Sequence, residues 1–254
     1  MTLRDAYVDL VLGGTCVGCA RAGRLLCAEC RAALPTDARS AWPTPAPVGL
    51  ARPFAAAPYD GTVKQLLLGF KERGMLALGR PLAALLAQAV RAAAAGIDAP
   101  LVLVPVPSRP ASVRARGLDS TYVLAVRAAR LLRHQGWTVS AVRLLRSRPG
   151  VLDQAGLDAA ARAVNLAGSM TCPSPGLRRL ARRQARAVAL VCDDVITTGA
   201  TAREAQRALE AVGLHVAAIA AVAATVKRGP APAPPPVRSA GPTSMWTPGT
   251  TLPP

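Results

Sequence analysis

The sequence predicts an α/β fold in which a parallel sheet is flanked by helices, with a small cysteine-rich module at the N-terminus. Between residues 59 and 228, short apolar runs alternate with longer segments of helical periodicity. Apolar runs without alternation are typical of strands buried on both faces. Strands that alternate with helices favour a parallel sheet with right-handed crossovers. Four of the six cysteines fall within residues 1–34, outside this pattern.

The first half of the 59–228 region carries four or five predicted elements. Helices are expected over 63–70 and 81–95, the second with a proline in its first turn, where proline is tolerated. A buried strand is expected over 101–106 and a helix over 120–134, closed by Gly136. The run 138–145 is the next strand candidate.

The second half begins with a polar and basic stretch, 146–185, whose weak periodicity predicts no element. It is followed by a buried strand over 187–192, a helix over 200–212 that ends at Gly213, and a last strand over 215–225. In open parallel sheets, ligands bind at the carboxyl ends of the strands. We therefore expect a site in the residues that follow the strand 101–106, up to residue 120, and in those that follow residue 192.

Composition divides the chain into four regions. Residues 1–34 form the cysteine module, and residues 35–58 are a Pro-rich connector that lies against the core or apart from it. Residues 59–228 are the main domain. Residues 229–254 are Pro-rich and lack the apolar density to fold, so a disordered tail is expected.

The chain of 254 residues is strongly basic, with 31 Lys+Arg against 14 Asp+Glu and a formal net charge of +17. Such a field favours anionic ligands such as nucleic acid or phosphorylated small molecules; biased codon usage is the alternative source of the arginines. The longest uncharged apolar stretch, 212–226, is shorter than the roughly 20 residues that span a bilayer. Asp5 and Asp9 interrupt any signal peptide. We expect a cytoplasmic protein with no membrane insertion and with reduced thiols.

The N-terminal cysteines stand in two pairs, Cys16-x2-Cys19 and Cys27-x2-Cys30. Four sulfurs at this spacing suit tetrahedral Zn²⁺ in a structural site, with two disulfides or an iron–sulfur cluster as alternatives. Cys172 and Cys192 are not expected to be ligands. Arginines near the module leave nucleic-acid contact as an alternative to a purely structural role.

The segment 187–201 predicts an anion site. A buried strand is followed by Asp193 and Asp194, and then by a loop that opens a helix. Amide groups at a helix start bind phosphate readily, and carboxylates accept hydrogen bonds from ribose hydroxyls or bind a divalent metal. We expect a 5′-phosphate at the loop and a ribose at the two aspartates; the alternative is a plain turn with threonine caps. The loop residues are Thr197, Thr198, Gly199, Ala200 and Thr201.

Two resemblances narrow this prediction. The segment VCDDVITTGAT resembles the phosphoribosyl-diphosphate signature of the type I phosphoribosyltransferase family. The Cys₄ N-terminus, YDGTVKQLLLGFKERG, VPVPSRPASVRARG and DQAGLDAAARAVNLAG, in this order, look like the ComF family, which is associated with competence and DNA uptake. The resemblance covers about residues 10–226.

The resemblance implies a type I phosphoribosyltransferase-like fold that binds phosphoribosyl diphosphate or a related ligand, with Mg²⁺ on the diphosphate if the protein is active. It places the diphosphate loop at Ser108 and Arg109, after the strand 101–106. The chain departs from the family where many relatives have Arg-Gly-Phe-Asn-Gln and this one has RGLDS at 116–120. Asp119 there is expected to cap the following helix.

Three functions remain open at this stage. The first is a ComF-like protein that binds a phosphoribosyl ligand and acts in DNA uptake or nucleotide metabolism, with single-stranded DNA or a DNA-handling protein as partner. The second is an active nucleobase phosphoribosyltransferase, a pentosyltransferase dependent on Mg²⁺. The third is a catalytically inactive regulatory protein on the same fold. The sequence identifies no general base, so whether the chain is an enzyme stays open.

Overall fold

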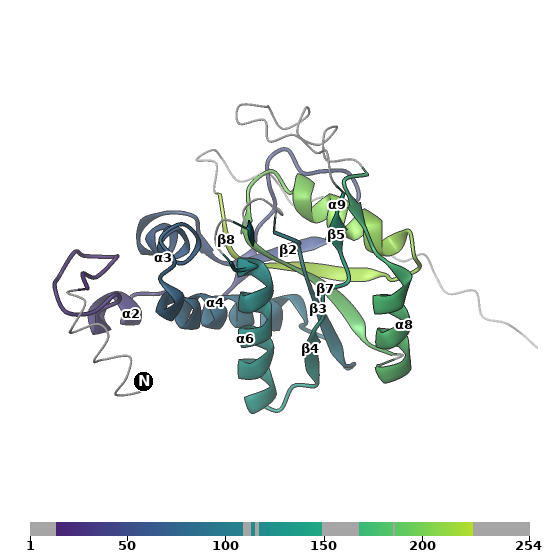
Figure 1. Cartoon of the computed structure of the whole chain (residues 1–254), viewed down its shortest axis with the longest axis horizontal. Coiled ribbons are helices and arrows are strands. Elements are labelled where there is room, and N and C mark those ends of the chain that lie inside the picture. The colour runs from purple at the N-terminus through teal and green to yellow at the C-terminus, as the bar shows by residue number, and fades with distance from the viewer. Residues whose placement is uncertain (1–13, 109–112, 115–116, 149–167, 185, 226–254) are drawn as a thin grey trace, which may run out of the picture.

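The computed structural model describes residues 14–108, 113–114, 117–148, 168–184 and 186–225. Its centre is a six-stranded sheet in the order β1-β2-β8-β7-β3-β4 (Figure 1). Neighbouring strands are parallel except for β1, which is antiparallel to β2. The strands are β1 (Arg39–Ser40), β2 (Arg52–Pro58), β3 (Leu101–Pro105), β4 (Val139–Ala141), β7 (Val188–Ile196) and β8 (Val216–Ala224). The predicted α/β fold class is confirmed.

Helices cover both faces of the sheet. One face packs against α3 (Gly61–Lys71), α4 (Gly79–Ala93) and α6 (Ser120–His134), and the other against α8 (Ser174–Arg183) and α9 (Ala200–Glu210). The smaller elements are α2 (Ala28–Ala32), the 3₁₀ turn η1 (Leu76–Leu78) and a two-stranded ribbon of β5 (Arg146–Ser147) and β6 (Met170–Thr171). The result is a three-layer arrangement with a buried cluster on each side of the sheet.

Strand β7 shows why these apolar runs become buried strands. Successive side chains of a strand point to opposite faces. Leu190 and Cys192 belong to the cluster under α4, whereas Ala189 and Val191 belong to the cluster under α9. Both faces are covered, so no polar alternation is needed. The small alanines of β8 let these layers approach closely.

Most predicted elements lie where the periodicity places them, and α6 spans the predicted 120–134. Two differ. The run 138–145 is a strand only over Val139–Ala141. Helix α8 was not predicted, because Leu180 is its single buried side chain and four of its ten residues are arginines. With so few apolar residues, the segment resembles a polar, basic stretch in the sequence.

The Pro-rich segment 35–58 is more than a connector. Its second half forms β2, which pairs with β8 from Arg52↔Ala218 to Pro58↔Ala224. Prolines and alanines have low strand propensity, which hid this strand in the sequence. The sheet therefore begins before residue 59, within the segment predicted to be a connector. Residues 1–13 and the tail 229–254 lie outside the described residues.

Cysteine-module residues also join the main core: Cys16, Leu26 and Cys27 are buried in the cluster formed with α3 and α4. The module is therefore packed on the domain. Among the described helices, none has the length and apolar character needed to cross a bilayer.

Candidate functional site

The two aspartates lie on a part of β7 that has a strand on one side only. Strand β3 ends at the pair Pro105↔Cys192, whereas β7 continues beside β8 to Ile196↔Ala224. Asp193 and Asp194 are thus inside the strand, and not after it as the sequence predicted. Each carboxylate also accepts the backbone N–H of the residue after it: the Asp194 N–H donates to Asp193 Oδ1 and the Val195 N–H to Asp194 Oδ1, both at 2.8 Å.

The two carboxylates continue opposite rows of the strand. Asp193 follows Val191 on the side of α9, and Asp194 follows Cys192 on the side of α3. Asp194 forms an ion pair with Lys71 at the C-terminal end of α3. Both aspartates are buried, so each carboxylate depends on a small number of partners.

Asp193 is a strongly perturbed acid at this edge of the sheet. Burial raises the pKa of its carboxyl to about 7, although the positive charge of Lys71 acts in the opposite direction. A carboxyl that titrates near neutral pH in a site of this kind is typical of groups that exchange protons or change their charge when a ligand binds. The group can therefore be neutral or ionised under ordinary conditions.

The loop after β7 turns at Gly199 and opens α9. Gly199 has φ +74°, a conformation that favours glycine. A Cβ at this position would lie 2.9 Å from Pro43 Cγ and 3.1 Å from Leu50 Cδ2. The glycine is thus required by its backbone conformation and by the close packing of the 43–50 segment. Thr198 Oγ1 accepts a hydrogen bond from the Ala200 N–H at 3.4 Å.

The 43–50 segment is fastened to α9, a relationship that the sequence did not suggest. Arg203 Nε donates to the Val48 carbonyl and Gln206 Nε2 to the Gly49 carbonyl, each at 3.0 Å. The Ala51 N–H donates to Gln206 Oε1 at 2.9 Å. The available sequence signal was a Gln on the buried face of this helix. The 43–50 segment, part of the stretch predicted to be a connector, therefore forms one wall of the predicted phosphate loop.

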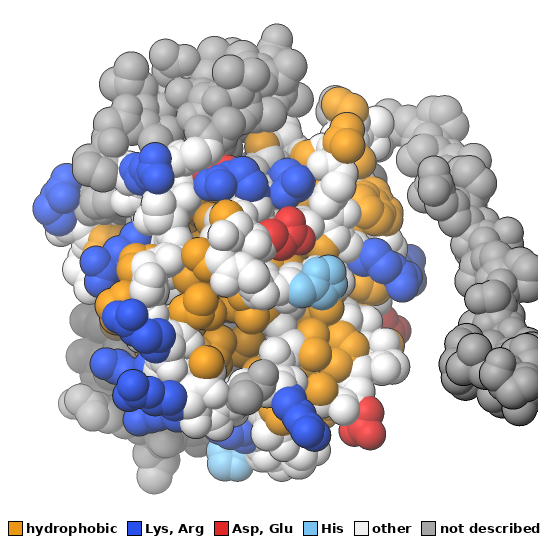
Figure 2. Space-filling model, turned by 90° about the vertical axis from the view of Figure 1, so that its right-hand side faces the viewer, with side chains coloured by type: hydrophobic (Ala, Val, Ile, Leu, Met, Phe, Trp, Pro, Cys, Tyr) orange, Lys and Arg blue, Asp and Glu red, His pale blue; other side chains and the backbone are white. Residues whose placement is uncertain are grey.

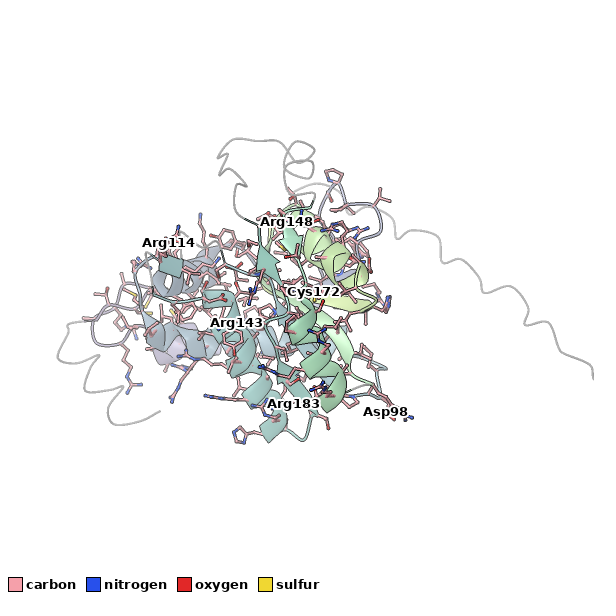
Figure 3. The ribbon with its side chains drawn as sticks, turned by 45° about the vertical axis from the view of Figure 1, so that its right-hand side comes forward. Asp98, Arg114, Arg143, Arg148, Cys172 and Arg183 are labelled. Carbon is pink, nitrogen blue, oxygen red and sulfur yellow. The ribbon has the colours of Figure 1, made fainter. Side chains whose placement is uncertain are left out.

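A second polar group lies past the ends of β3 and β4. Ser108 Oγ donates to Asp119 Oδ1 at 2.9 Å, and Arg143 Nε lies 3.4 Å from Asp119 Oδ2. Asp119 also accepts the Tyr122 N–H at 3.3 Å, as the expected N-cap of α6. The Arg143 guanidinium lies 3.5 Å from the centre of the Tyr122 ring (Arg143 is labelled in Figure 3). Arg109 lies outside the described residues.

Arg143 is the functional candidate that sequence reasoning missed. It follows β4 by two residues and so lies at the carboxyl edge of the sheet, like Ser108 after β3. The usable signal was an arginine just after a predicted strand, but the strand was expected to run to residue 145. The acid Asp119 is balanced by this cation and is not a lone negative charge near the site.

The ribbon of β5 and β6 is held against α9. Glu204 is buried, accepts the Met170 N–H at 2.9 Å and pairs with Arg207 at 2.7 Å. Arg207 Nη2 also donates to the Met170 carbonyl at 3.1 Å. The Arg148 N–H donates to the Ser169 carbonyl at 2.7 Å. The parts of the chain that flank the segment 149–167 are therefore held side by side at the ribbon. Those residues, and the motif within them, lie outside the described part of the chain.

The four N-terminal cysteines form a candidate metal centre. Their Sγ atoms all lie within 4.8 Å of one another, and Cys19 and Cys27 are 3.7 Å apart. Zn–S bonds of about 2.3 Å in a tetrahedron place sulfurs about 3.8 Å apart, so the cluster fits a zinc ion. None of the six cysteines, all of them described, is in a disulfide. The disulfide alternative is therefore wrong, and the predicted metal cluster is supported.

Two thiols of this cluster have shifted pKa values. Burial raises the pKa of Cys16, but the Cys27 N–H and neighbouring groups lower it more, to about 6. The hydrogen bond to Cys27 and burial raise the pKa of Cys30 to about 12. Four adjacent thiolates need a metal to ionise together. Gly18 serves this cluster by close approach, since a Cβ there would lie 2.8 Å from Cys30 Sγ.

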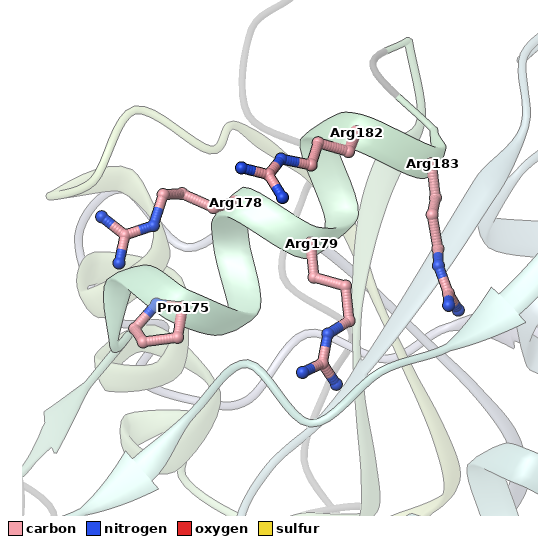
Figure 4. A pocket seen from close by; sticks show the side chains of 5 residues that line it. All are labelled: Pro175, Arg178, Arg179, Arg182 and Arg183. Carbon is pink, nitrogen blue, oxygen red and sulfur yellow. The ribbon is translucent and has the colours of Figure 1, made fainter.

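A basic surface covers the outer side of α8. Pro175 and four arginines, Arg178, Arg179, Arg182 and Arg183, line a concavity of about 380 Å³ (Figure 4). Figure 2 shows the face that includes this helix, where basic side chains are spread widely and acidic ones are sparse. This surface is separate from Asp193 and Asp194. Both aspartates are buried, and neither lines the concavity.

Comparison with known proteins adds little. No family model matches the sequence, and no curated protein matches it either. Among solved structures, the chain is similar to the crystal structure of TT1426 from Thermus thermophilus. The identity is 20%, the match covers 60% of this chain and 86% of that chain, and the TM-score is 0.26. A TM-score this low carries no argument about function.

Proposed function

We propose that this protein binds phosphoribosyl diphosphate or a related phosphoribosyl compound at the carboxyl edge of β7. The observation that carries the proposal is the succession of two buried aspartates on the free end of β7 and a Thr/Gly loop that opens α9. The same residues carry the resemblance to type I phosphoribosyltransferases and to the ComF family.

The chemistry of the edge supports this ligand. The first turn of α9 offers amide groups and a positive dipole end to a 5′-phosphate, and the three threonines of the loop offer hydroxyls. Asp193 and Asp194 supply acceptors for ribose hydroxyls. Ser108 and Arg143 lie past β3 and β4, where a diphosphate on the far side of the ribose would need donors. Carboxylate oxygens also suit Mg²⁺ that arrives with the diphosphate.

The second candidate is an active phosphoribosyltransferase. It is favoured by the pKa of Asp193, which burial brings to about 7, where a carboxylate can take up a proton during a reaction. Diphosphate release from phosphoribosyl diphosphate with Mg²⁺ and a panel of nucleobases measures this activity. Binding without release under any of these conditions would favour the regulatory alternative on the same fold.

The link to DNA uptake or nucleotide metabolism rests on the ComF resemblance. Single-stranded DNA or a DNA-handling protein is the partner this implies, and the net charge of +17 is compatible with either. The module of Cys16, Cys19, Cys27 and Cys30 is assigned a structural zinc, which staples a segment too small to fold alone.

The decisive experiment is a calorimetric titration of the full chain with phosphoribosyl diphosphate and Mg²⁺. Asp193→Asn should weaken binding by roughly tenfold or more, the loss expected for one charged hydrogen bond. Asp98→Asn is the matched control, because Asp98 is an exposed acid before β3, at the opposite edge of the sheet (Figure 3). Equal affinity of the wild type and Asp193→Asn, or no binding by the wild type, would contradict the proposal.

A further inference from the structure

A second groove lies where the cysteine module meets the main domain. It has a volume of about 380 Å³, within the range of small-molecule sites. Figure 1 shows α2 of the module beside α3 and α4, on the side of the molecule away from α8. The groove is lined by residues of the module, of η1 and the start of α4, and of α6.

Four arginines from three parts of the chain line this groove. Arg24 and Arg31 come from the module, Arg80 from the first turn of α4, and Arg127 from α6. None of the described lining residues is acidic. Side chains brought together from distant parts of the sequence are a feature of the fold and not of a local charge run.

Arg127 is the fixed point of this cluster. Its Nη1 donates to the Leu76 carbonyl at 3.1 Å, and the guanidinium passes so close to Gly79 that a Cβ there would clash with it. Burial, with the neighbouring charges of Arg80 and Arg130, lowers the pKa of Arg127. Like charges held together at a partly buried position are stabilised when an anion enters between them. The start of α4 adds its dipole in the same sense.

The remaining lining is apolar, which limits the kind of anion. Leu25 is half-buried and Leu76 is 53% exposed, so these two side chains present an apolar surface next to the guanidiniums, whereas Leu26 and Pro81 are buried. A small inorganic anion would leave this surface in water. A ligand with phosphates and a flat organic body would cover it, and guanidinium planes also stack on such bodies.

We propose that this groove is a binding site for a nucleoside phosphate, with the phosphates on Arg24, Arg31, Arg80 and Arg127 and the nucleoside on the leucine surface. A free nucleotide and one unit of a single strand share this chemistry. The site is independent of the phosphoribosyl site, because the aspartates and their loop belong to the carboxyl edge of the sheet and none of them lines the groove.

The test uses the full zinc-loaded chain at one low salt concentration, with three probes: ATP, inorganic triphosphate and a single-stranded oligothymidylate. Arg31→Glu/Arg80→Glu is compared with Arg178→Glu/Arg182→Glu, which makes the same change of charge on α8. The four substituted arginines are all exposed, so both double variants should fold. Thermal unfolding of each variant checks this. Asp193→Asn separates this site from the phosphoribosyl site.

The groove variant should lose at least about tenfold in affinity for ATP or the oligonucleotide, against less than about threefold for the α8 variant and for Asp193→Asn. Loss for ATP identifies a free nucleotide as the source, and loss for the oligonucleotide alone identifies a strand. An equal or larger loss in the α8 variant would mean that the overall charge attracts the probes and would overturn the proposal. Inorganic triphosphate binding as tightly as ATP would overturn the nucleoside assignment.

Discussion

Lys71 at the end of α3 forms an ion pair with Asp194 on the free end of β7. The Asp194 side chain is 9% exposed and that of Lys71 is 27% exposed, so the pair is largely removed from water. It joins the helix layer to the strand that carries the candidate site. A buried carboxylate without its cation is costly, and this makes the pair sensitive to single substitutions.

Lys71→Met should destabilise the fold by about 2 to 4 kcal/mol, because it leaves Asp194 as a buried, uncompensated charge. Denaturant unfolding measures the change. The double variant Lys71→Met/Asp194→Leu should recover much of the loss, since it removes the charge as well. As a control, Arg21→Gln breaks the exposed pair with Glu29 and should leave stability nearly unchanged, because water screens exposed pairs. A double variant no more stable than Lys71→Met would argue against this role.

Asp193 should make stability fall as the pH rises from about 4 to about 7. The unfolded carboxyl loses its proton near its ordinary value of 3.8, whereas burial keeps the folded pKa at about 7. The native state therefore binds more protons within this window, and the free energy of unfolding decreases with pH and then levels off. Asp193→Asn removes this dependence. The free energy of unfolding of the variant minus that of the wild type should therefore increase by up to about 4 kcal/mol between pH 4 and pH 8.

The measurement is denaturant unfolding of the two proteins across this pH range, without phosphoribosyl ligand or Mg²⁺. Taking the difference between them cancels the other titrating groups. A constant difference at all pH values would show that the Asp193 pKa is not raised.

Metal removal should destabilise the whole domain and not the module alone, because Cys16, Leu26 and Cys27 are buried in the main core. The purified chain should contain zinc in equimolar amount by elemental analysis, and Cys19→Ser should lose it and unfold at a lower temperature. Cys172→Ala should keep its zinc, since Cys172 is buried away from the cluster. Iron in place of zinc would favour the iron–sulfur alternative.

Gly199→Ala and Gly213→Ala form a matched pair. Both glycines have positive φ, +74° and +80°, so either substitution costs about 1 to 2 kcal/mol of backbone strain. At Gly199 the new methyl also meets Pro43 and Leu50, whereas at Gly213 nothing lies within 4 Å. Gly199→Ala should therefore be the more destabilising in denaturant unfolding, by about 1 to 3 kcal/mol. Equal losses would mean that the 43–50 segment does not pack on the loop.

The sequence predicted the layers of the fold because their signal is local. Helix α6 has strong 3.6-residue periodicity, an N-cap at Asp119 and a terminating Gly136, and its bounds were predicted correctly. Strand β2 was missed because its prolines and alanines give no strand signal; its place depends on β8, far along the chain. The end of β7 was misplaced because acids are rare in buried strands, although here each carboxylate accepts the backbone N–H of the next residue.

The sequence predicted the candidate site in part, and the limit was again that only local features can be predicted. The order of Asp193, Asp194 and the loop is a property of consecutive residues and could be read directly. The separation of the two carboxylates onto different faces, the partner Lys71 and the cation Arg143 depend on which helix and strand lie nearby. The packing of Pro43 on Gly199 joins residues more than 150 positions apart, and nothing local indicates it.

The pairing of β2 with β8 also sets the order in which the protein can be completed during synthesis. β8 stands between β2 and β7 in the sheet, yet among the described strands it is the last to leave the ribosome. Until then β2 has only the two-residue β1 beside it, and the free edge of β7 faces water. Closing so long a loop is slow and exposes unpaired edges. A chain stopped before residue 216 should therefore be prone to aggregation and should depend on chaperones, although most of its helices are already present.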